Sequence, residues 1–159
     1  MDSERFEELV RAHAPAVEAY ARSIAPDRWV AEEATQETFL RAWQYLDSFR
    51  GEGSFEGWLI RICRSRVIEL ATARRAEPAG DELDDLVGTE PPDRAWEVLD
   101  ELRALPVTQR EAVVLCGLYG YDYESAAEIA GVPVGTIRSR LHRARGALAS
   151  ALRHGRRSA

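Results

Sequence analysis

The stretch that decides the fold is YESAAEIAGVPVGTIRSRLHR, residues 123–143. A short apolar helical pattern ends at Gly131, a tight turn follows at Val132-Pro133, and a second helical pattern begins directly after it. Ala127, four residues before Gly131, supplies the small side chain that two crossing helices need. Ile137, six residues after Gly131, is placed to anchor the second helix in a core. This spacing predicts a helix-turn-helix.

The second helix of this unit separates an apolar stripe from a basic face. The stripe consists of Ile137, Leu141, Ala144, Leu148 and Leu152. A basic helix with a polar start can enter the major groove and read bases while its N-terminal amides meet a phosphate. The alternative is a solvated helix in a small bundle, but a face of one sign after such a turn favours DNA reading. The candidates are Arg138, Ser139, Arg140, His142, Arg143 and Arg145, of which Arg138, His142 and Arg145 share a face.

Charge is segregated along the 159 residues, although the whole chain has a net charge of −6. All 21 basic residues are arginines, whose forked donors suit phosphates and guanine edges. Residues 58–76 carry a net charge of +4 and residues 129–159 a net charge of +7, whereas residues 77–101 between them carry −9. This asymmetry indicates partners of opposite sign at different places.

Several classes of protein are excluded by composition. No apolar run is long enough to span a membrane, and the charged start of the chain is unlike a secretory signal. Cys63 and Cys116 have no metal-ligand spacing, and we expect both to be buried in a reduced, cytoplasmic protein. The three histidines show no triad or metal spacing, so we expect no enzyme and no cofactor.

The helical period dominates the rest of the chain, which predicts an all-α fold of two small domains joined by an acidic linker. We expect the first domain over residues 1–76, the linker over 77–93 and the helix-turn-helix domain over 94–159. Ser3 is the expected cap of the first helix, Pro15 the expected start of a second, and Phe39, Trp43 and Leu46 are expected to point inward. The expected helices cover residues 3–13, 15–24, 30–46, 54–73, 95–105, 108–119, 123–130 and 134–152.

A second basic stretch, residues 49–66, interleaves aromatic residues with arginines. Aromatic faces beside guanidinium groups suit a single strand, because bases stack on the rings and the arginines neutralise the backbone. The alternative is that Phe55 and Trp58 are core residues, and the sequence does not decide between the two.

Three segments together resemble the extracytoplasmic-function group of bacterial sigma factors, over about residues 5–75 and 95–152. EEATQETFLRAW (32–43) looks like the polymerase-binding helix of that group. FRGEGSFEGWLIRICRSRVIEL (49–70) looks like its promoter-melting loop and −10 recognition helix. ALPVTQREAVVLCGLYGYDYESAAEIAGVPVGTIRSRLHRAR (104–145) looks like its −35 domain. The resemblance implies a sigma factor that binds core RNA polymerase, recognises the −10 and −35 promoter elements and promotes DNA melting.

The resemblance also implies a role for each matching residue. The clamp coiled coil of the largest polymerase subunit would meet Glu33, Gln36, Glu37 and Trp43. The −10 element would meet Ser54, Phe55, Trp58, Arg61, Arg64, Ser65 and Arg66. The −35 duplex would meet Thr136, Arg138, Ser139, Arg140, His142, Arg143 and Arg145. The chain departs from the usual pattern at Ser65 (commonly Asn), Glu69 (commonly Asp), Ala34-Thr35, Ala126 and Ala130.

The resemblance further implies an anti-sigma factor as a partner and an acidic linker in the path of the nascent RNA. One rival is a stand-alone helix-turn-helix regulator, which explains residues 104–152 but leaves residues 30–70 unused. Another is a polymerase-binding adaptor that has lost DNA recognition, and the intact arginine set speaks against it.

Overall fold

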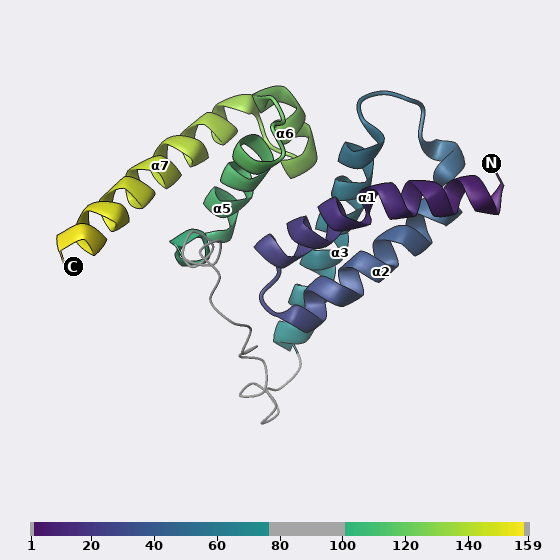
Figure 1. Cartoon of the computed structure of the whole chain (residues 1–159), viewed down its shortest axis with the longest axis horizontal. Helices are drawn as coiled ribbons and strands as arrows, with labels where there is room; N and C mark the ends of the chain where they lie inside the picture. The colour runs from purple at the N-terminus through teal and green to yellow at the C-terminus, as the bar shows by residue number, and fades with distance from the viewer. Residues whose placement is uncertain (1, 77–100, 158–159) are drawn as a thin grey trace. The chain divides into compact units, whose positions relative to one another are not determined.

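The computed structural model describes residues 2–76 and 101–157, and all regular structure in those residues is helical. The chain forms two compact units, the first with helices α1 to α3 and the second with α5 to α7 (Figure 1). The predicted all-α class is confirmed. The linker predicted at 77–93 lies outside the described residues, as does most of the helix predicted at 95–105, of which residues 101–104 are helical. No helix in the described residues has the length and apolarity to cross a membrane.

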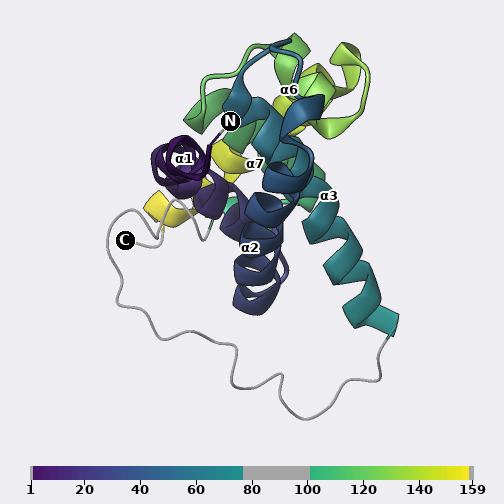
Figure 2. The same ribbon diagram turned by 90° about the vertical axis from the view of Figure 1, so that its right-hand side faces the viewer.

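The first unit packs α1 (Ser3–Ile24), α2 (Arg28–Gln44) and α3 (Phe55–Ala76) against one another. Figures 1 and 2 show α2 beside α3, and a 3₁₀ turn, η1 (Leu46–Ser48), follows α2. Each helix turns one face inward, and the largest fully buried side chains of this core are Val17, Tyr20, Val30, Thr38, Leu59, Ile60 and Cys63.

Helix α1 is continuous through Pro15, so the predicted break there is wrong. Proline inside a helix costs about 3 kcal/mol. Burial of a large apolar side chain returns about 1.5–3 kcal/mol, and Val17, Tyr20 and Ile24 are all buried beyond the proline. The packing therefore outweighs the local cost. The predicted cap is also one residue off, because the Asp2 carboxylate accepts a hydrogen bond from the Arg5 N–H at 3.0 Å.

The loop between α2 and α3 ends in a capped helix start. Gly51 and Gly53 have φ angles of 77° and 76°, a region that strongly favours glycine. The Ser54 hydroxyl then accepts a hydrogen bond from the Gly57 N–H at 3.0 Å, which satisfies one of the free amides at the start of α3. The break expected between the helices at 30–46 and 54–73 is confirmed.

The second unit contains the predicted helix-turn-helix. Helix α6 (Tyr123–Ala130) ends at Gly131, whose φ of 67° is left-handed, and α7 (Val134–Arg157) follows. The Val132 N–H bonds back to the Ala127 carbonyl at 3.1 Å, which closes the end of α6. Ala127 and Ile137 are both buried, as the spacing predicts.

Helix α5 (Val107–Val113) continues into a π-helical turn, η3 (Val114–Leu118), where the sequence predicts α-helix to Tyr119. The Tyr119 N–H bonds to the Val114 carbonyl at 3.1 Å, five residues back. Arg110 joins α5 to the preceding segment, because its Nε donates to the Leu102 carbonyl at 3.0 Å and its Nη2 to the Leu105 carbonyl at 3.1 Å. The pattern of apolar residues predicts neither the π-helical turn nor the hydrogen bonds of Arg110.

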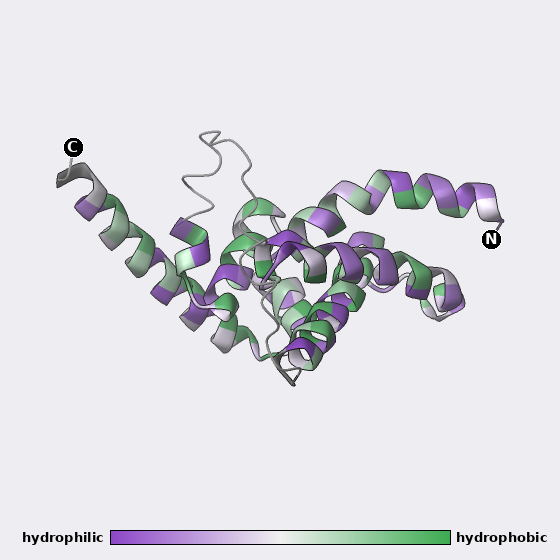
Figure 3. Cartoon of the chain, turned by 90° about the horizontal axis from the view of Figure 1, so that it is seen from below, coloured by the Kyte–Doolittle hydropathy of each residue, from purple (hydrophilic) through white to green (hydrophobic). Residues whose placement is uncertain are grey.

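Helix α7 contains both hydrophilic and hydrophobic residues, as the mixed colours of the C-terminal helix in Figure 3 show. Ile137, Leu141 and Ala144 are buried as predicted, and Leu148 packs against the cluster formed with Leu102 and Leu105. Leu152 is 63% exposed, so the predicted stripe is wrong at its end. Leu152 lies one turn beyond Leu148, and Leu148 is the last residue of the stripe that packs against that cluster.

Candidate functional site

The outer face of α7 presents most of the predicted −35 contacts to solvent. Arg138, Ser139, His142, Arg143 and Arg145 are exposed, whereas Thr136 and Arg140 are half-buried. The opposite stripe of the same helix fills the core. The predicted division between an exposed basic face and an apolar packing face is therefore present in the fold.

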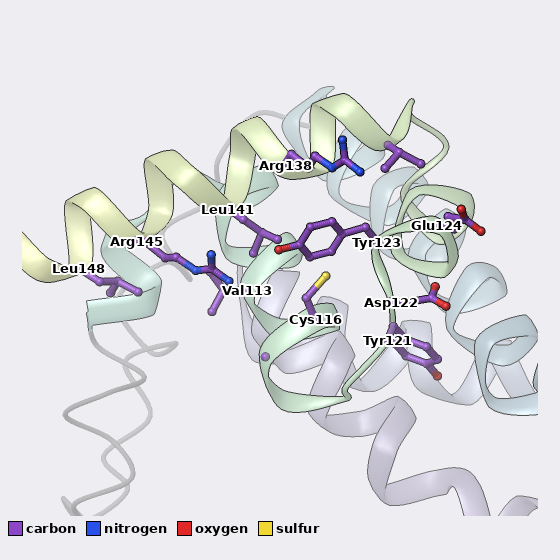
Figure 4. Close-up of a pocket in the computed structure, with 12 residues that line it drawn as sticks. Val113, Cys116, Tyr121, Asp122, Tyr123, Glu124, Arg138, Leu141, Arg145 and Leu148 are labelled. Atoms are coloured by element: carbon purple, nitrogen blue, oxygen red, sulfur yellow. The ribbon is translucent and has the colours of Figure 1, made fainter.

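Two of these arginines border a pocket on their flank of the helix. Arg138 and Arg145 line a cavity of about 660 Å³ with Cys116 and Tyr123 (Figure 4). The Arg138 guanidinium lies 6.0 Å from the centroid of the Tyr123 ring, at the limit of a cation–π contact. Partial burial raises the pKa of the Cys116 thiol, and the charge of Arg145 opposes that shift. The expected burial is thus complete for Cys63 and only partial for Cys116.

Helix α3 has an outward face that contains Arg61 and Ser65, both exposed, with Arg64 half-buried beside them. Arg66 lies elsewhere. Its side chain is only 12% exposed and forms ion pairs with Glu37 of α2 and Glu69 of α3. The structure thus brings together two residues, Glu37 and Arg66, that the resemblance assigns to different partners.

The aromatic residues of the second basic stretch form one cluster. The rings of Phe49, Phe55 and Trp58 have centroids 5.4–5.5 Å apart, and all three side chains are half-buried. The ring of His13 on α1 lies 5.4 Å from Phe55, and its Nδ1 lies 4.0 Å from a carboxylate oxygen of Glu56. Trp58 is therefore both packed and partly accessible, which falls between the two predicted alternatives. Ser54, the remaining loop candidate, is exposed and caps α3.

The exposed face of α2 combines an amide with apolar side chains. Gln36 is exposed, Leu40 is 65% exposed and Trp43 is 47% exposed. The inward orientation predicted for Trp43 is wrong, because its ring packs at the edge of the unit against Phe6, with centroids 4.9 Å apart. Glu33 and Glu37 are half-buried at the margin of this face. Sequence reasoning missed Leu40, although its spacing of four from Gln36 and three from Trp43 puts it on the same helical face.

Cys63 is buried in the core of the first unit. Burial raises the pKa of its thiol to about 11, and a hydrogen bond with Thr38 opposes the shift. Ala126 and Ala130, which depart from the usual family pattern, are buried in α6. Their small side chains therefore belong to the packing of the helix-turn-helix.

Comparison with known proteins identifies both units. The family described as Sigma-70 region 2 matches residues 9–77, and the family described as Sigma-70, region 4 matches residues 95–148. The chain is 36% identical over 149 residues to the ECF RNA polymerase sigma factor EcfG of Rhodopseudomonas palustris, covering 90% of this chain and 82% of EcfG.

Two further similarities agree with these matches. The chain is 34% identical over 151 residues to the ECF RNA polymerase sigma factor SigE of Mycolicibacterium smegmatis, covering 88% of this chain but 58% of SigE. The fold matches that of the sigma factor RpoE, solved in complex with the anti-sigma factor NepR from Bartonella quintana, with a TM-score of 0.79 and 30% identity. That match covers 94% of this chain and 98% of RpoE. The chain therefore belongs to the ECF family of RNA polymerase sigma factors.

Proposed function

We propose that this chain binds core RNA polymerase through α2, opens the −10 promoter element with the aromatic cluster and α3, and reads the −35 element with α7. The observation that carries the proposal is that each of these elements buries one face and exposes another whose chemistry suits that partner. The chain performs no bond chemistry in this role and acts in the cytoplasm, where promoter DNA and polymerase meet.

The exposed face of α2 suits a protein partner better than a nucleic acid. Leu40 and Trp43 leave apolar surface in water, and neighbouring apolar and aromatic groups of this kind mark protein interfaces. Gln36 adds a polar side chain to orient the contact. We assign this face, with Glu33 and Glu37 at its margin, to the polymerase.

The aromatic cluster and α3 suit an opened strand. Unstacking duplex DNA costs roughly 1–2 kcal/mol per step, and stacking a base on an aromatic ring returns about 1–3 kcal/mol. The half-buried rings of Phe55 and Trp58 are held by their neighbours, so little ordering is needed when a base arrives. We assign Arg61 and Arg64 of α3 to the phosphates of the opened strand, and the exposed Ser54 and Ser65 to the same strand.

The outer face of α7 suits duplex DNA. Arg138 and Arg143 present the forked donors that bind guanine edges, and the other exposed groups of the face supply phosphate contacts. Each unit alone would bind weakly. Linking them raises the effective concentration of the second site once the first is engaged.

We further propose that an anti-sigma protein holds the chain inactive. The structure of RpoE, which this fold resembles, contains such a partner. The exposed Leu40 and Trp43 are a surface that the inhibitor must cover to exclude polymerase.

Co-elution with sigma-free core polymerase on a sizing column tests the proposal. We expect a one-to-one complex that Leu40→Glu abolishes. Leu118→Glu is the matched control, because Leu118 is 67% exposed but lies in the second unit. Failure of the folded, inhibitor-free chain to bind polymerase, together with specific promoter binding by the chain alone, would overturn the proposal in favour of a stand-alone regulator.

A further inference from the structure

Arg66 and Arg61 both lie on α3 but differ in their surroundings. The Nε and Nη2 of Arg66 both contact Oε2 of Glu37 on α2, and its Nη1 contacts Oε2 of Glu69 one turn further along α3. The side chain is 12% exposed, whereas Arg61 is exposed on the outer face of the same helix. A phosphate would have to displace two carboxylates to reach this guanidinium, so Arg66 is a poor candidate for a DNA contact.

The other end of this ion pair lies beside the polymerase-binding face. Glu37 follows Gln36 on α2, and its side chain is 29% exposed. Arg66 contacts this carboxylate at Oε2. The carboxylate is therefore held by Arg66 while its side chain keeps part of its surface exposed to a partner.

We propose that Arg66 is a positioning residue for polymerase binding: it orients the partly exposed Glu37 carboxylate so that this group accepts a hydrogen bond from a cationic donor on core polymerase. This inference rests on the proposed function. An oriented carboxylate loses less conformational entropy on binding than a free one, so the gain appears as affinity. The pair also joins the helix that meets polymerase to the helix that faces the −10 element, across 29 residues of sequence.

This assignment lowers the number of arginines on α3 that contact DNA phosphates. Phosphate contacts of α3 then come from Arg61 and Arg64 and not from Arg66. Each phosphate contact adds about 0.7–0.9 to the slope of log affinity against log salt concentration. Arg66 should contribute nothing to that slope.

Two titrations test the proposal. In the first, a fluorescently labelled full-length chain is titrated with core polymerase in the absence of DNA, for Arg66→Ala, Glu37→Gln and the double variant. In the second, assembled holoenzyme is titrated with promoter DNA at several salt concentrations, for Arg66→Ala and Arg61→Ala. Val67→Ala is the stability control, because Val67 follows Arg66 in α3 and is only 3% exposed, which leaves it almost no surface for polymerase or DNA.

We expect Arg66→Ala and Glu37→Gln each to weaken polymerase affinity by about tenfold. The double variant should bind no more weakly than either single variant, because each substitution already breaks the same ion pair. Val67→Ala should lower the melting temperature without this loss. Arg66→Ala should keep the salt slope of promoter binding, whereas Arg61→Ala should reduce it. If Arg66→Ala is poorly folded, Arg66→Lys, which keeps the charge but cannot bind both carboxylates in fork geometry, should show a smaller loss of polymerase affinity.

The opposite result would overturn the inference: unchanged polymerase affinity with a salt slope reduced as in Arg61→Ala would make Arg66 a DNA contact. Additive losses from Glu37→Gln and Arg66→Ala would likewise reject the coupling. These outcomes are distinct from failure of the proposed function, in which the unmodified chain would not bind polymerase at all.

Discussion

The two units of this chain differ in whether the candidate contact residues also stabilise the fold. In the second unit, α7 packs with one face and presents another, and the candidate DNA contacts at Ser139, His142 and Arg143 are exposed. In the first unit, candidate contacts also hold the fold together, since Ser54 caps α3, Trp58 belongs to an aromatic cluster and Arg66 joins two helices.

This difference predicts how mutations will behave. Substitutions on the outer face of α7 should change DNA binding without changing stability. Substitutions at Ser54, Trp58 or Arg66 in the first unit should change both, so a loss of activity in one of these variants does not by itself identify a contact.

Ile137→Ala should have the largest effect, because Ile137 is fully buried on the packing side of α7. Truncation of a buried isoleucine costs about 2–5 kcal/mol. We expect the second unit to unfold at lower denaturant concentration and −35 recognition to be lost with it. Urea unfolding followed by circular dichroism measures the change, and equal stability of the variant would contradict the packing described here.

Cys63 should make the first unit sensitive to alkaline pH. Its thiol has a pKa of about 11 in the folded chain, against 9.0 for an unperturbed thiol. The unfolded state therefore loses its proton first, and the free energy of unfolding should fall as pH rises from about 9 to about 11, by up to about 2–3 kcal/mol. Comparing Cys63→Ala with the unmodified chain by urea unfolding across that pH range isolates this contribution. An identical pH dependence in both proteins would refute it.

Arg143→Ala should weaken binding of holoenzyme to a promoter by about 1–3 kcal/mol at one base pair, if its guanidinium reads a guanine. Its side chain is exposed, so the melting temperature should not change. Arg110→Ala is the structural counterpart, because Arg110 donates to the carbonyls of Leu102 and Leu105. That variant should lose stability, and equal melting temperatures of the two variants would break the contrast.

Ser54→Ala should have the smallest effect, a loss of about 1 kcal/mol of unfolding free energy from the missing cap of α3. Ser139→Ala is the matched control in the other unit. Its hydroxyl donates to the Gly135 carbonyl within α7, which adds little to helix stability. Thermal melting of both variants compares the two serines directly, and a larger loss for Ser139→Ala would reverse the interpretation of the two units.

Local patterns in the sequence predict the second unit better than the first. The helix-turn-helix follows from the positions of Ala127, Gly131 and Ile137 within one short stretch, and the structure confirms it. The ion pair of Glu37 and Arg66 joins residues 29 positions apart, and no helical period relates them. Trp43, near the end of α2, likewise packs against Phe6, near the start of α1, and no local pattern relates these two residues.

The π-helical turn at Val114–Leu118 has a consequence for changes in chain length. Such a turn holds one residue more than the α-helical turn it replaces, and each residue of an α-helix advances the chain by about 100° around the axis. Removing one residue here would let η3 close into an ordinary α-helical turn. Among single-residue deletions across 107–130, we expect deletion of Gly117 to be tolerated best, because its removal costs no side-chain packing beyond its own backbone.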